Sequence, residues 1–372
     1  MEKIKIAMIT NDLNINGISS VVMSYCKYLC PETYEITVIC GSPVSNYNCG
    51  VLEQEGIKVY KLPSRKKKIL QYHIKLIRIL AQNNYDIVHV HGNSATMVIP
   101  LSIAKVLKVK MRIAHCHSDK CEHPFLHKLL SIPFKLSYTH AVACSVSAGE
   151  WIFKEGYKII INGIDTNRFR FSERLRNQTR KELYIADEDF VYGHVGRMNA
   201  VKNQEFIIDL FSIEASKNPR SKLVLVGTGP NFEHIKQLVK THQYRERIIL
   251  YGECNDTSKI YNALDCFILP SLHEGFGIVA IEAQINGLPC IVSTNVPEEV
   301  DFSRNVRFCS INRMSEWITH MEKIEHYIIE QSSIEDRRRF FGENIDKIKR
   351  FSIEQSIIEL DNLYKQNIID VS

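Results

Sequence analysis

The sequence predicts an α/β protein built from two Rossmann-like, doubly wound domains. The chain has 372 residues, which is long for a single hydrophobic core when a domain takes roughly 150 residues. Short, continuously apolar runs alternate with helix-like ones, as expected for parallel sheets that are covered on both faces by helices. The alternation stops near residue 165 and restarts near residue 189, so we expect the chain to divide there.

The first predicted domain comprises residues 1–165. Its strand-like runs are short and apolar at consecutive positions, which indicates strands buried on both faces. The helix-like runs between them supply the crossovers that parallel strands need. The expected strands are residues 4–10, 34–40, 58–63, 85–91, 111–117 and 140–145, and the expected helices are residues 21–30, 51–57, 65–82, 95–107 and 125–139.

The second predicted domain, residues 166–350, repeats this pattern. Residues 351–372 are expected to form a C-terminal helix that packs back toward the N-terminal domain, and the two domains are expected to face a central cleft. The expected strands are residues 189–197, 221–229, 247–252, 265–271 and 288–293, and the expected helices are residues 203–216, 231–242, 257–264, 278–287 and several segments from residue 314 onward.

Composition and cysteine usage predict a cytoplasmic protein. Hydrophobic residues make up 45% and charged residues 24%, which is ordinary for a soluble globular chain. The eleven cysteines are scattered and form no CxxC pair, so we expect them to be reduced and mostly buried. The N-terminal run KIKIAMIT is too short for a secretory signal, and the longest nearly apolar run, MVIPLSIAKVL, is too short to cross a bilayer.

Positive charge is concentrated in the first half of the chain. Residues 1–165 carry 20 Lys and Arg against 12 Asp and Glu. The densest patch is RKKK, from Arg65 to Lys68, which opens a predicted amphipathic helix. A basic amphipathic helix suits the anionic inner face of a membrane, where the protein would be peripheral. The alternative is a surface helix that only packs its apolar stripe on the sheet.

Loops that follow strands hold most of the chemically suggestive residues. In doubly wound sheets ligands bind beyond the carboxyl ends of the strands. Gly17 lies in the first such loop, where a residue without Cβ lets a ligand approach the backbone. The other loops of this kind contain His115 and His117, Arg197 and Lys202, Gly227 and Gly229, and the stretch PSLHEGFG at residues 270–277.

The stretch HEGFGIVAIE, residues 273–282, predicts a site for a phosphorylated sugar. A glycine-flanked loop that leads into a helix offers unpaired N–H groups and a positive dipole to a phosphate. Arg197 and Lys202 would add two cations, which suits a diphosphate. Glu274 and Glu282 would be repelled by phosphate unless they accept hydrogen bonds from sugar hydroxyls. A nucleotide sugar, with ribose, diphosphate and hexose, has this layout.

Two other clusters suggest metal binding but are not expected to provide it. The stretch HCHSDKCEH, residues 115–123, gathers His, Asp and Cys, yet its spacing fits no standard zinc site, and His115 is expected to pack or to orient a neighbour. The DED run at residues 187–189 precedes a strand, so a solvated turn is expected there. No metal or other cofactor is expected, because a nucleotide sugar would be the substrate.

The motifs together resemble those of retaining glycosyltransferases with the GT-B fold, in particular family 4. EGFGIVAIE looks like the E-x7-E signature of that family, and GHVGRMNAVKNQEFII, LVLVGTGP, YNALDCFILPSLHEGFG and GLPCIVS follow the family's order and approximate spacing. Upstream, YDIVHVHGNSATM, RIAHCHSDK and IINGIDTNRF resemble the branch that builds bacterial capsules and exopolysaccharides. The similarity covers nearly the whole chain.

The resemblance implies roles for single residues. Arg197 and Lys202 match the pair that neutralises the donor's diphosphate. Glu274 matches the Glu that holds hydroxyls of the transferred sugar, and Glu282 matches the Glu that binds ribose. His117 matches the active-site His near donor sugar and acceptor, so His117 and Glu274 are the expected catalytic residues. The remaining donor-binding positions are the backbone at Phe276, Gly277 and Ile278, and Gly17 in the first loop.

Two departures weaken parts of this match. The first loop reads NING rather than the commoner double glycine, so only Gly17 carries over. The stretch after Pro297, EEVDFSRNVRFCSI, lacks the glycine-rich turn of many relatives, although the exopolysaccharide branch often lacks it too.

The resemblance implies transfer of a hexosyl group, usually from a UDP-sugar, to a growing and lipid-linked surface polysaccharide. In retaining members the acceptor hydroxyl is thought to attack from the leaving-group face, so no nucleophile–base pair is expected. Two alternatives are a sugar-nucleotide epimerase on the same scaffold and a non-catalytic nucleotide-sugar-binding protein. No nucleic-acid partner is expected. The sequence leaves the donor base, the sugar, the linkage and the oligomeric state open.

Overall fold

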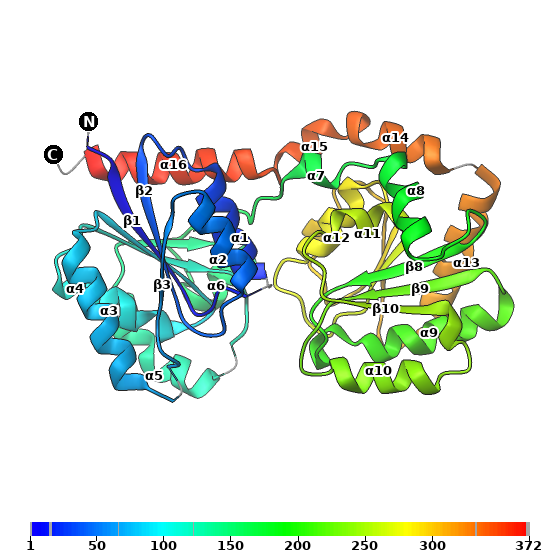
Figure 1. The fold of residues 1–372 in the computed structure, drawn as a ribbon, viewed down its shortest axis with the longest axis horizontal. Helices are drawn as coiled ribbons and strands as arrows, with labels where there is room; N and C mark the ends of the chain where they lie inside the picture. The colour runs from blue at the N-terminus through cyan, green and yellow to red at the C-terminus, as the bar shows by residue number, and fades with distance from the viewer. Residues whose placement is uncertain (1, 15–16, 66, 122, 332, 370–372) are drawn as a thin grey trace. The chain divides into compact units, whose positions relative to one another are not determined.

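The computed structural model describes residues 2–14, 17–65, 67–121, 123–331 and 333–369. The chain folds into two compact units (Figure 1). Unit 1 is Met1–Gly163 together with Ile353–Ser372, and unit 2 is Ile164–Ser352. These borders lie two residues from the borders predicted at 165 and 350.

Unit 1 contains a seven-stranded parallel sheet with the order β3-β2-β1-β4-β5-β6-β7. The chain winds outward from β1 in one direction and then from β4 in the other, which defines a doubly wound sheet. Its strands are β1 (Ile4–Thr10), β2 (Tyr34–Cys40), β3 (Lys58–Lys61), β4 (Ile87–Gly92), β5 (Met111–Cys116), β6 (His140–Ala143) and β7 (Lys158–Ile159).

Helices cover both faces of this sheet (Figure 1). The helices α3, α4 and α5 pack in sequence against one another. Helix α16 contacts α1, and Ile353, Leu360 and Tyr364 enter the core with Tyr25 of α1. The helices of unit 1 are α1 (Gly17–Tyr28), α2 (Asn46–Gln54), α3 (Ile69–Asn83), α4 (Val98–Val106), α5 (Pro124–Lys135), α6 (Val146–Ile152) and α16 (Ile353–Ile369), with the 3₁₀ turn η1 (Ala95–Met97).

Unit 2 contains a six-stranded parallel sheet with the order β10-β9-β8-β11-β12-β13. Its strands are β8 (Phe190–Val195), β9 (Ser221–Val226), β10 (Ile248–Gly252), β11 (Cys266–Leu269), β12 (Cys290–Ser293) and β13 (Val306–Cys309). Its helices are α7 (Thr166–Phe169), α8 (Glu173–Glu182), α9 (Gln204–Lys217), α10 (Phe232–Thr241), α11 (Ser258–Ala263), α12 (Ile278–Ile285), α13 (Met314–Gln331), α14 (Ser333–Glu343) and α15 (Ile345–Lys349), with the 3₁₀ turns η2 (Ala200–Lys202), η3 (Arg245–Arg247) and η4 (Glu298–Val300).

Two doubly wound parallel sheets confirm the predicted fold class. The differences concern helix starts and elements that were not predicted, which are the helices α6, α7 and α8 and the strands β7 and β13. Helix α2 begins five residues earlier than predicted because Ser45 caps it, its hydroxyl accepting from Asn48 N. Helix α1 begins at Gly17 rather than at residue 21. Helix α8 was not predicted. None of the helices in the described part of the chain combines the length and the apolar character needed to cross a bilayer.

Helix α8 is held to the sheet by buried charge rather than by an apolar stripe. Arg176 and Arg180 each place a guanidinium nitrogen on a different oxygen of Asp265, at 2.7 and 2.5 Å. Asp265 precedes β11 and also accepts from Val191 N at 2.8 Å. Since the other guanidinium N–H groups donate to backbone carbonyls such as Leu264 O, the buried network has its hydrogen bonds satisfied.

Candidate active site

The loop after β8 carries both predicted cations, Arg197 and Lys202. Arg197 is exposed, whereas Lys202 is partly buried at the end of η2. The side chain of Asn199 caps this turn by accepting from Lys202 N at 3.0 Å. The cap fixes the backbone of Lys202 and therefore the direction in which its long side chain leaves the loop.

Gly227 and Gly229, in the loop after β9, let that loop lie directly against the loop of the two cations. Both have positive φ, 132° and 155°. A Cβ at Gly227 would stand 2.0 Å from Gly196 O, and one at Gly229 would stand 2.3 Å from Met198 O. A side chain at either position would therefore displace the backbone that carries Arg197.

Glu274, in the loop after β11, meets Lys202. The Lys202 ammonium group forms an ion pair with Glu274 Oε2, and both side chains are about one-sixth exposed. Ser271 donates to the same carboxylate oxygen at 3.0 Å. The structure thus brings together two residues that lie 72 positions apart in the sequence, one suited to a phosphate and one suited to hydroxyl groups.

Gly277 is the cap residue just before α12, and its backbone conformation explains why this position of the loop is a glycine. Its φ is 74°, a left-handed conformation that favours glycine. A Cβ there would also stand 3.1 Å from Val300 and 3.2 Å from Val296. The neighbouring predicted residues, Phe276 and Ile278, are partly buried, and the start of α12, where helices have N–H groups without partners inside the helix, follows the loop of Glu274 directly.

Glu282 lies in α12 and accepts a hydrogen bond from the Tyr261 hydroxyl at 2.8 Å. Burial raises the pKa of Glu282 to about 7, although the Tyr261 hydrogen bond and the positive charge of Arg168 act in the opposite direction. The carboxyl group is therefore divided between its charged and neutral forms near neutral pH.

Sequence reasoning missed three polar residues that support these side chains. They are Ser271, Tyr261 and His194. His194 donates from Nδ1 to Ile268 O at 2.9 Å, and its Nε2 faces the amide nitrogen of Gln204 at 3.2 Å. Burial lowers the pKa of His194 to about 4, so the ring stays neutral close to Lys202. Their side chains lie near the ends of strands or in a helix, and no spacing in the sequence marks them. The only hint was the position of His194 near the end of β8.

Unit 1 contains the two remaining predicted residues, Gly17 and His117. Gly17 is exposed at the start of α1, and a Cβ there would meet nothing within 4 Å. Packing among the described residues therefore gives no reason for a glycine at this position.

His117 follows β5 and is 9% exposed. Its Nδ1 donates to Asn162 Oδ1 at 2.9 Å, and its Nε2 lies 3.0 Å from His91 Nδ1. Burial lowers the pKa of His117 to about 4. A neutral ring with both nitrogens engaged offers no proton to a substrate unless one of these hydrogen bonds opens.

The stretch HCHSDKCEH does not gather into one metal-type cluster within the described residues. His115 is fully buried while His123 is exposed, and the cluster of possible metal ligands that forms instead joins His115 to His89 and His91. The DED run lies in the turn before β8, where Asp189 accepts from Ala186 N at 2.8 Å.

Comparison with known families covers most of the chain. The family described as "Glycosyltransferase Family 4" matches residues 15–168, and the family described as "Glycosyl transferases group 1" matches residues 176–345. The two matches meet close to the border between unit 1 and unit 2.

Relatives of similar length are named as glycosyltransferases. The putative glycosyltransferase EpsF of Bacillus subtilis is 28% identical over 260 residues, which are 66% of this chain and 67% of that protein. The UDP-Gal:alpha-D-GlcNAc-diphosphoundecaprenol alpha-1,3-galactosyltransferase of Escherichia coli is 28% identical over 313 residues, 78% of this chain and 79% of that one. The capsular polysaccharide biosynthesis glycosyltransferase CapM of Staphylococcus aureus is 30% identical over 55% of this chain and 52% of its own length.

Solved structures show the same fold. Anabaena Alr3699/HepE, in complex with UDP and glucose, superimposes with a TM-score of 0.80 at 18% identity, covering 97% of this chain and 99% of that one. WaaG, a glycosyltransferase involved in lipopolysaccharide biosynthesis, gives a TM-score of 0.64 at 15% identity over 92% and 99% of the two chains. The fold is GT-B, and the chain belongs to the family 4 glycosyltransferases.

Proposed function

We propose that the protein transfers a hexosyl group from a nucleotide sugar, in particular a UDP-sugar, to a lipid-linked surface polysaccharide acceptor with retention of the anomeric configuration. The contact between Lys202 and Glu274 at the carboxyl end of the unit 2 sheet carries this proposal. In this proposal the Lys202 ammonium group would bind the leaving diphosphate, and the adjacent Glu274 carboxylate would accept hydrogen bonds from hydroxyls of the transferred sugar.

The proposed chemistry follows the movement of charge. Breaking the anomeric C–O bond leaves negative charge on the diphosphate, which Arg197, Lys202 and the first N–H groups of α12 would stabilise. Glu274 would hold hydroxyls of the sugar ring, where positive charge develops. The acceptor oxygen forms the new bond to the anomeric carbon, and its proton passes to the departing phosphate oxygen. This route asks no protein side chain to act as a base, which agrees with the neutral, fully engaged ring of His117.

Glu282 and Tyr261 support a ribose at the other end of the donor. Tyr261 occupies one carboxylate oxygen of Glu282, and the other oxygen is left to accept from a ribose hydroxyl. The printed names of relatives suggest the rest of the proposal, since one uses UDP-Gal with a diphosphoundecaprenol acceptor and another acts in capsule biosynthesis.

Single substitutions test the donor site. With a donor found by screening nucleotide sugars, Lys202→Ala and Glu274→Ala should each lower kcat by about 100- to 1000-fold, the range for removing one preorganised charge from a transition state. Lys217→Ala is the matched control, because it breaks a half-exposed ion pair with Glu322 on the surface of unit 2. The anomeric configuration of the product, read by NMR, tests retention.

Three outcomes would contradict the proposal. Unchanged turnover in Lys202→Ala and Glu274→Ala would remove the donor site. Conversion of the donor sugar to its epimer in the absence of an acceptor would identify the protein as an epimerase, whereas donor binding without any turnover across acceptors would identify a nucleotide-sugar-binding protein.

We also propose that unit 1 docks on anionic membrane lipid through α3, α4 and α5, where a lipid-linked acceptor would be found. These helices contain no Asp or Glu. Their solvent side carries large apolar residues that are 45–81% exposed, among exposed lysines. The apolar residues are Ile69, Leu70, Ile74 and Ile77 of α3, Val106 of α4, and Phe125, Leu129 and Ile132 of α5.

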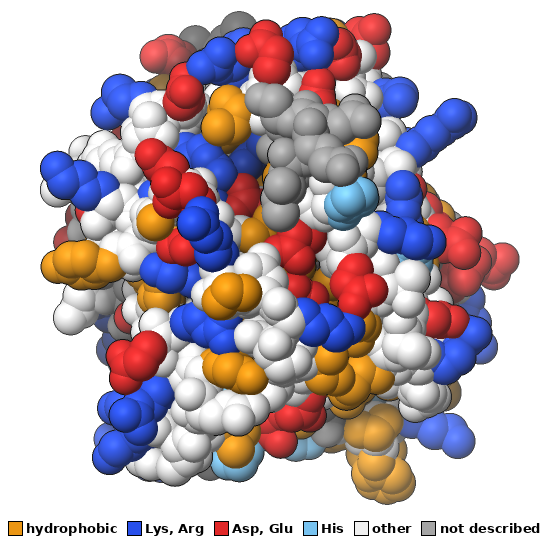
Figure 2. Space-filling model, turned by 90° about the vertical axis from the view of Figure 1, so that its right-hand side faces the viewer, with side chains coloured by type: hydrophobic (Ala, Val, Ile, Leu, Met, Phe, Trp, Pro, Cys, Tyr) orange, Lys and Arg blue, Asp and Glu red, His pale blue; other side chains and the backbone are white. Residues whose placement is uncertain are grey.

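This surface differs from the face shown in Figure 2, where Lys and Arg side chains are interspersed with Asp and Glu. A surface that is both apolar and uniformly basic suits the headgroup region of an anionic bilayer. The predicted RKKK run continues this surface: Lys67 and Lys68 are exposed and Arg65 is partly buried, while Lys66 lies outside the described residues.

Co-sedimentation with vesicles tests the docking. Neutralising Arg65 to Lys68 should lower binding to phosphatidylglycerol vesicles at least tenfold, at about 1 kcal/mol per charge, and the loss should shrink at high salt. Leu129→Ser with Ile132→Ser should lower binding at all salt concentrations, because it removes inserted apolar surface. Tyr184→Ser, which changes an 89% exposed residue of unit 2, is the control. Binding that is indifferent to both sets of changes would refute the docking.

A further inference from the structure

Four histidines lie on one face of the unit 1 sheet, at the carboxyl ends of two neighbouring strands. His89 and His91 lie two positions apart on β4, and His115 and His117 stand in the same relation along and just after β5, with His91 directly opposite His115. Since side chains alternate along a strand, all four rings point to the face covered by α1 and α16. His89, His91 and His115 are 0–1% exposed.

These three rings are neutral. Burial lowers the pKa of His89 to about 3 and lowers those of His91 and His115 well below the ordinary value. A neutral imidazole keeps one lone pair on a ring nitrogen, which is the form that binds metal ions.

The direction of the hydrogen bonds decides where the lone pair of His91 lies. Asn162 Oδ1 can only accept, so His117 Nδ1 carries the proton and His117 Nε2 accepts. His91 must then donate from Nδ1 to His117 Nε2, across 3.0 Å. In a neutral ring this leaves His91 Nε2 with a bare lone pair, and that buried atom has no hydrogen-bond partner among the described residues. A buried acceptor without a partner is costly.

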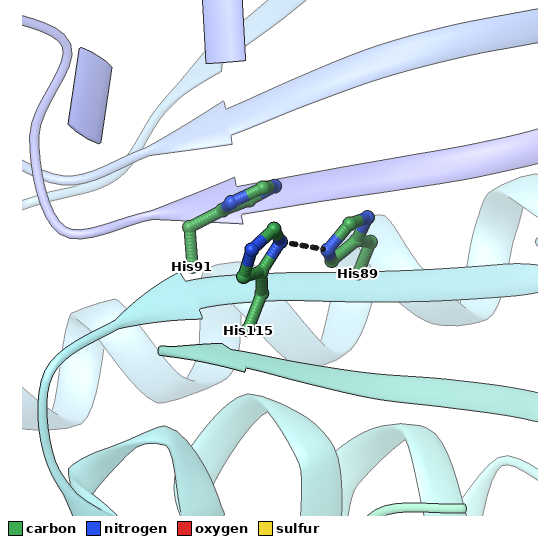
Figure 3. A group of neighbouring side chains, drawn as sticks. All are labelled: His89, His91 and His115. Atoms are coloured by element: carbon green, nitrogen blue, oxygen red, sulfur yellow. Dashed lines mark hydrogen bonds between the residues drawn. The ribbon is translucent and has the colours of Figure 1, made fainter. Parts of the chain in front are cut away.

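The other two rings bring further nitrogens to the same place. Figure 3 shows the rings of His89, His91 and His115 lying side by side above β4 and β5, and one nitrogen from each lies within 4.8 Å of the others. His89 Nε2 and His115 Nδ1 are 3.1 Å apart. Two nitrogens bound to one tetrahedral zinc ion at 2.0–2.1 Å would be separated by about 3.3 Å. The third ring would have to move closer to this pair to complete such a set.

We propose that His89, His91 and His115 bind a structural divalent metal ion, with zinc the best match to three imidazole ligands. The outer nitrogens of two ligands are already oriented, as metal-bound histidines require. His89 Nδ1 lies 2.7 Å from the Tyr364 hydroxyl of α16, and His91 Nδ1 is held by His117 and through it by Asn162.

The ion would cross-link the ends of β4 and β5 beneath His117. Tyr25 of α1 is a candidate for the fourth ligand. Its buried hydroxyl has no partner among the described residues, and its ring centroid lies 6.0–6.4 Å from those of the three imidazoles. The site does not rest on the proposed function, and it departs from the expectation, drawn from the sequence, that the protein binds no metal.

Metal analysis of the untagged protein tests the site. Elemental analysis should find about one zinc per chain, and replacement by Co²⁺ should give the visible d–d bands of a tetrahedral site. His91→Gln and His115→Gln should each abolish both signals. His234→Gln, at a half-exposed histidine of α10, should change neither. Tyr364→Phe should weaken metal affinity by about 10- to 100-fold in competition with a chromophoric chelator, because it removes an orienting partner.

The wild-type protein alone can overturn the proposal. Less than one-tenth of an ion per chain after purification, together with no Co²⁺ bands on titration, would show that the three rings share protons instead of an ion. This holds even if His91→Gln or His115→Gln fails to fold. Signals that survive in folded His91→Gln and His115→Gln would place the ion elsewhere and also overturn the assignment.

Discussion

Glu282 shows how burial of one side chain sets a pH requirement for the proposed donor. In the free protein burial raises the pKa of Glu282 to about 7. Ribose hydroxyls donate hydrogen bonds, which favour the charged carboxylate, so donor binding must release a proton at lower pH. The affinity should therefore be constant above about pH 8 and fall by up to tenfold per pH unit below about pH 6.

Titration calorimetry with a nucleotide sugar at several pH values measures this dependence of affinity on pH. The diphosphate diester of the ligand does not titrate in this range, so a change in affinity comes from the protein. Glu282→Gln should bind more weakly at high pH and give a nearly flat profile. A wild-type profile that runs parallel to that of Glu282→Gln would assign the pH dependence to another group.

Sequence patterns predicted that Lys202 and Glu274 come together better than they predicted the residues that hold the site in place. Lys202 and Glu274 both follow strands, and the rule that parallel strands present their carboxyl ends at one edge was enough to expect them together. Tyr261 and His194 act through buried hydrogen bonds whose partners lie 21 and 74 positions away. Such partners depend on packing between elements, which spacing in a single sequence does not reveal.

Between α9 and α13, two buried glutamates couple helix packing to pH. Burial, followed by the neighbouring carboxyl group of Glu325, raises the pKa of Glu214 to about 8. Because the folded-state pKa lies above the unfolded one, this group stabilises the fold fully below about pH 4.5 and loses that contribution as the pH rises toward 8. Unit 2 should therefore lose unfolding free energy as the pH rises across this range.

Urea unfolding of wild type and Glu214→Gln at acid and alkaline pH measures this loss. Glu214→Gln should reduce the difference between the two pH values, since an amide keeps a hydrogen-bond donor without titrating. Glu188→Gln, at an exposed glutamate in the turn before β8, should leave the wild-type difference unchanged. Equal pH dependence in wild type and Glu214→Gln would contradict the role given to this pair.

Helix α8 explains why one element escaped prediction. Its sequence, ERLRNQTRKE, has no apolar stripe, so apolar periodicity cannot detect it. The helix is instead fixed by Arg176 and Arg180 on Asp265. Apolar patterns predicted the elements that pack through hydrophobic surface. The sequence of an element held by buried ion pairs is polar throughout, so the same patterns predict a solvated loop there.

For the molecule as a whole, the division into units assigns α16 to unit 1, although 189 residues of unit 2 come before it in the chain. Ile353, Leu360, Leu363 and Tyr364 are 0–7% exposed in the core of unit 1. At about 1.5–3 kcal/mol for each buried apolar side chain, their removal would cost as much as the entire stability of a typical domain. Truncation after residue 352 should therefore unfold unit 1 and leave unit 2 folded.

Limited proteolysis and thermal unfolding check this expectation. The truncated chain should lose one of two melting transitions, and a protease-resistant fragment should remain that corresponds to residues 164–352. Ile358→Ala, at a 55% exposed position of α16, should retain both transitions. Survival of both transitions in the truncated chain would show that α16 contributes little to unit 1.

The interrupted course of unit 1 also bears on how the protein is made. The ribosome makes all of unit 2 in one continuous stretch. The strands of unit 1, which are made earlier, cannot complete their core until α16 has been made after unit 2. The middle of the polypeptide can therefore reach its native state before its beginning does. A nascent chain that stalls late should carry a finished second unit and an unfinished first one, which makes the earliest-synthesised half the part most in need of chaperones.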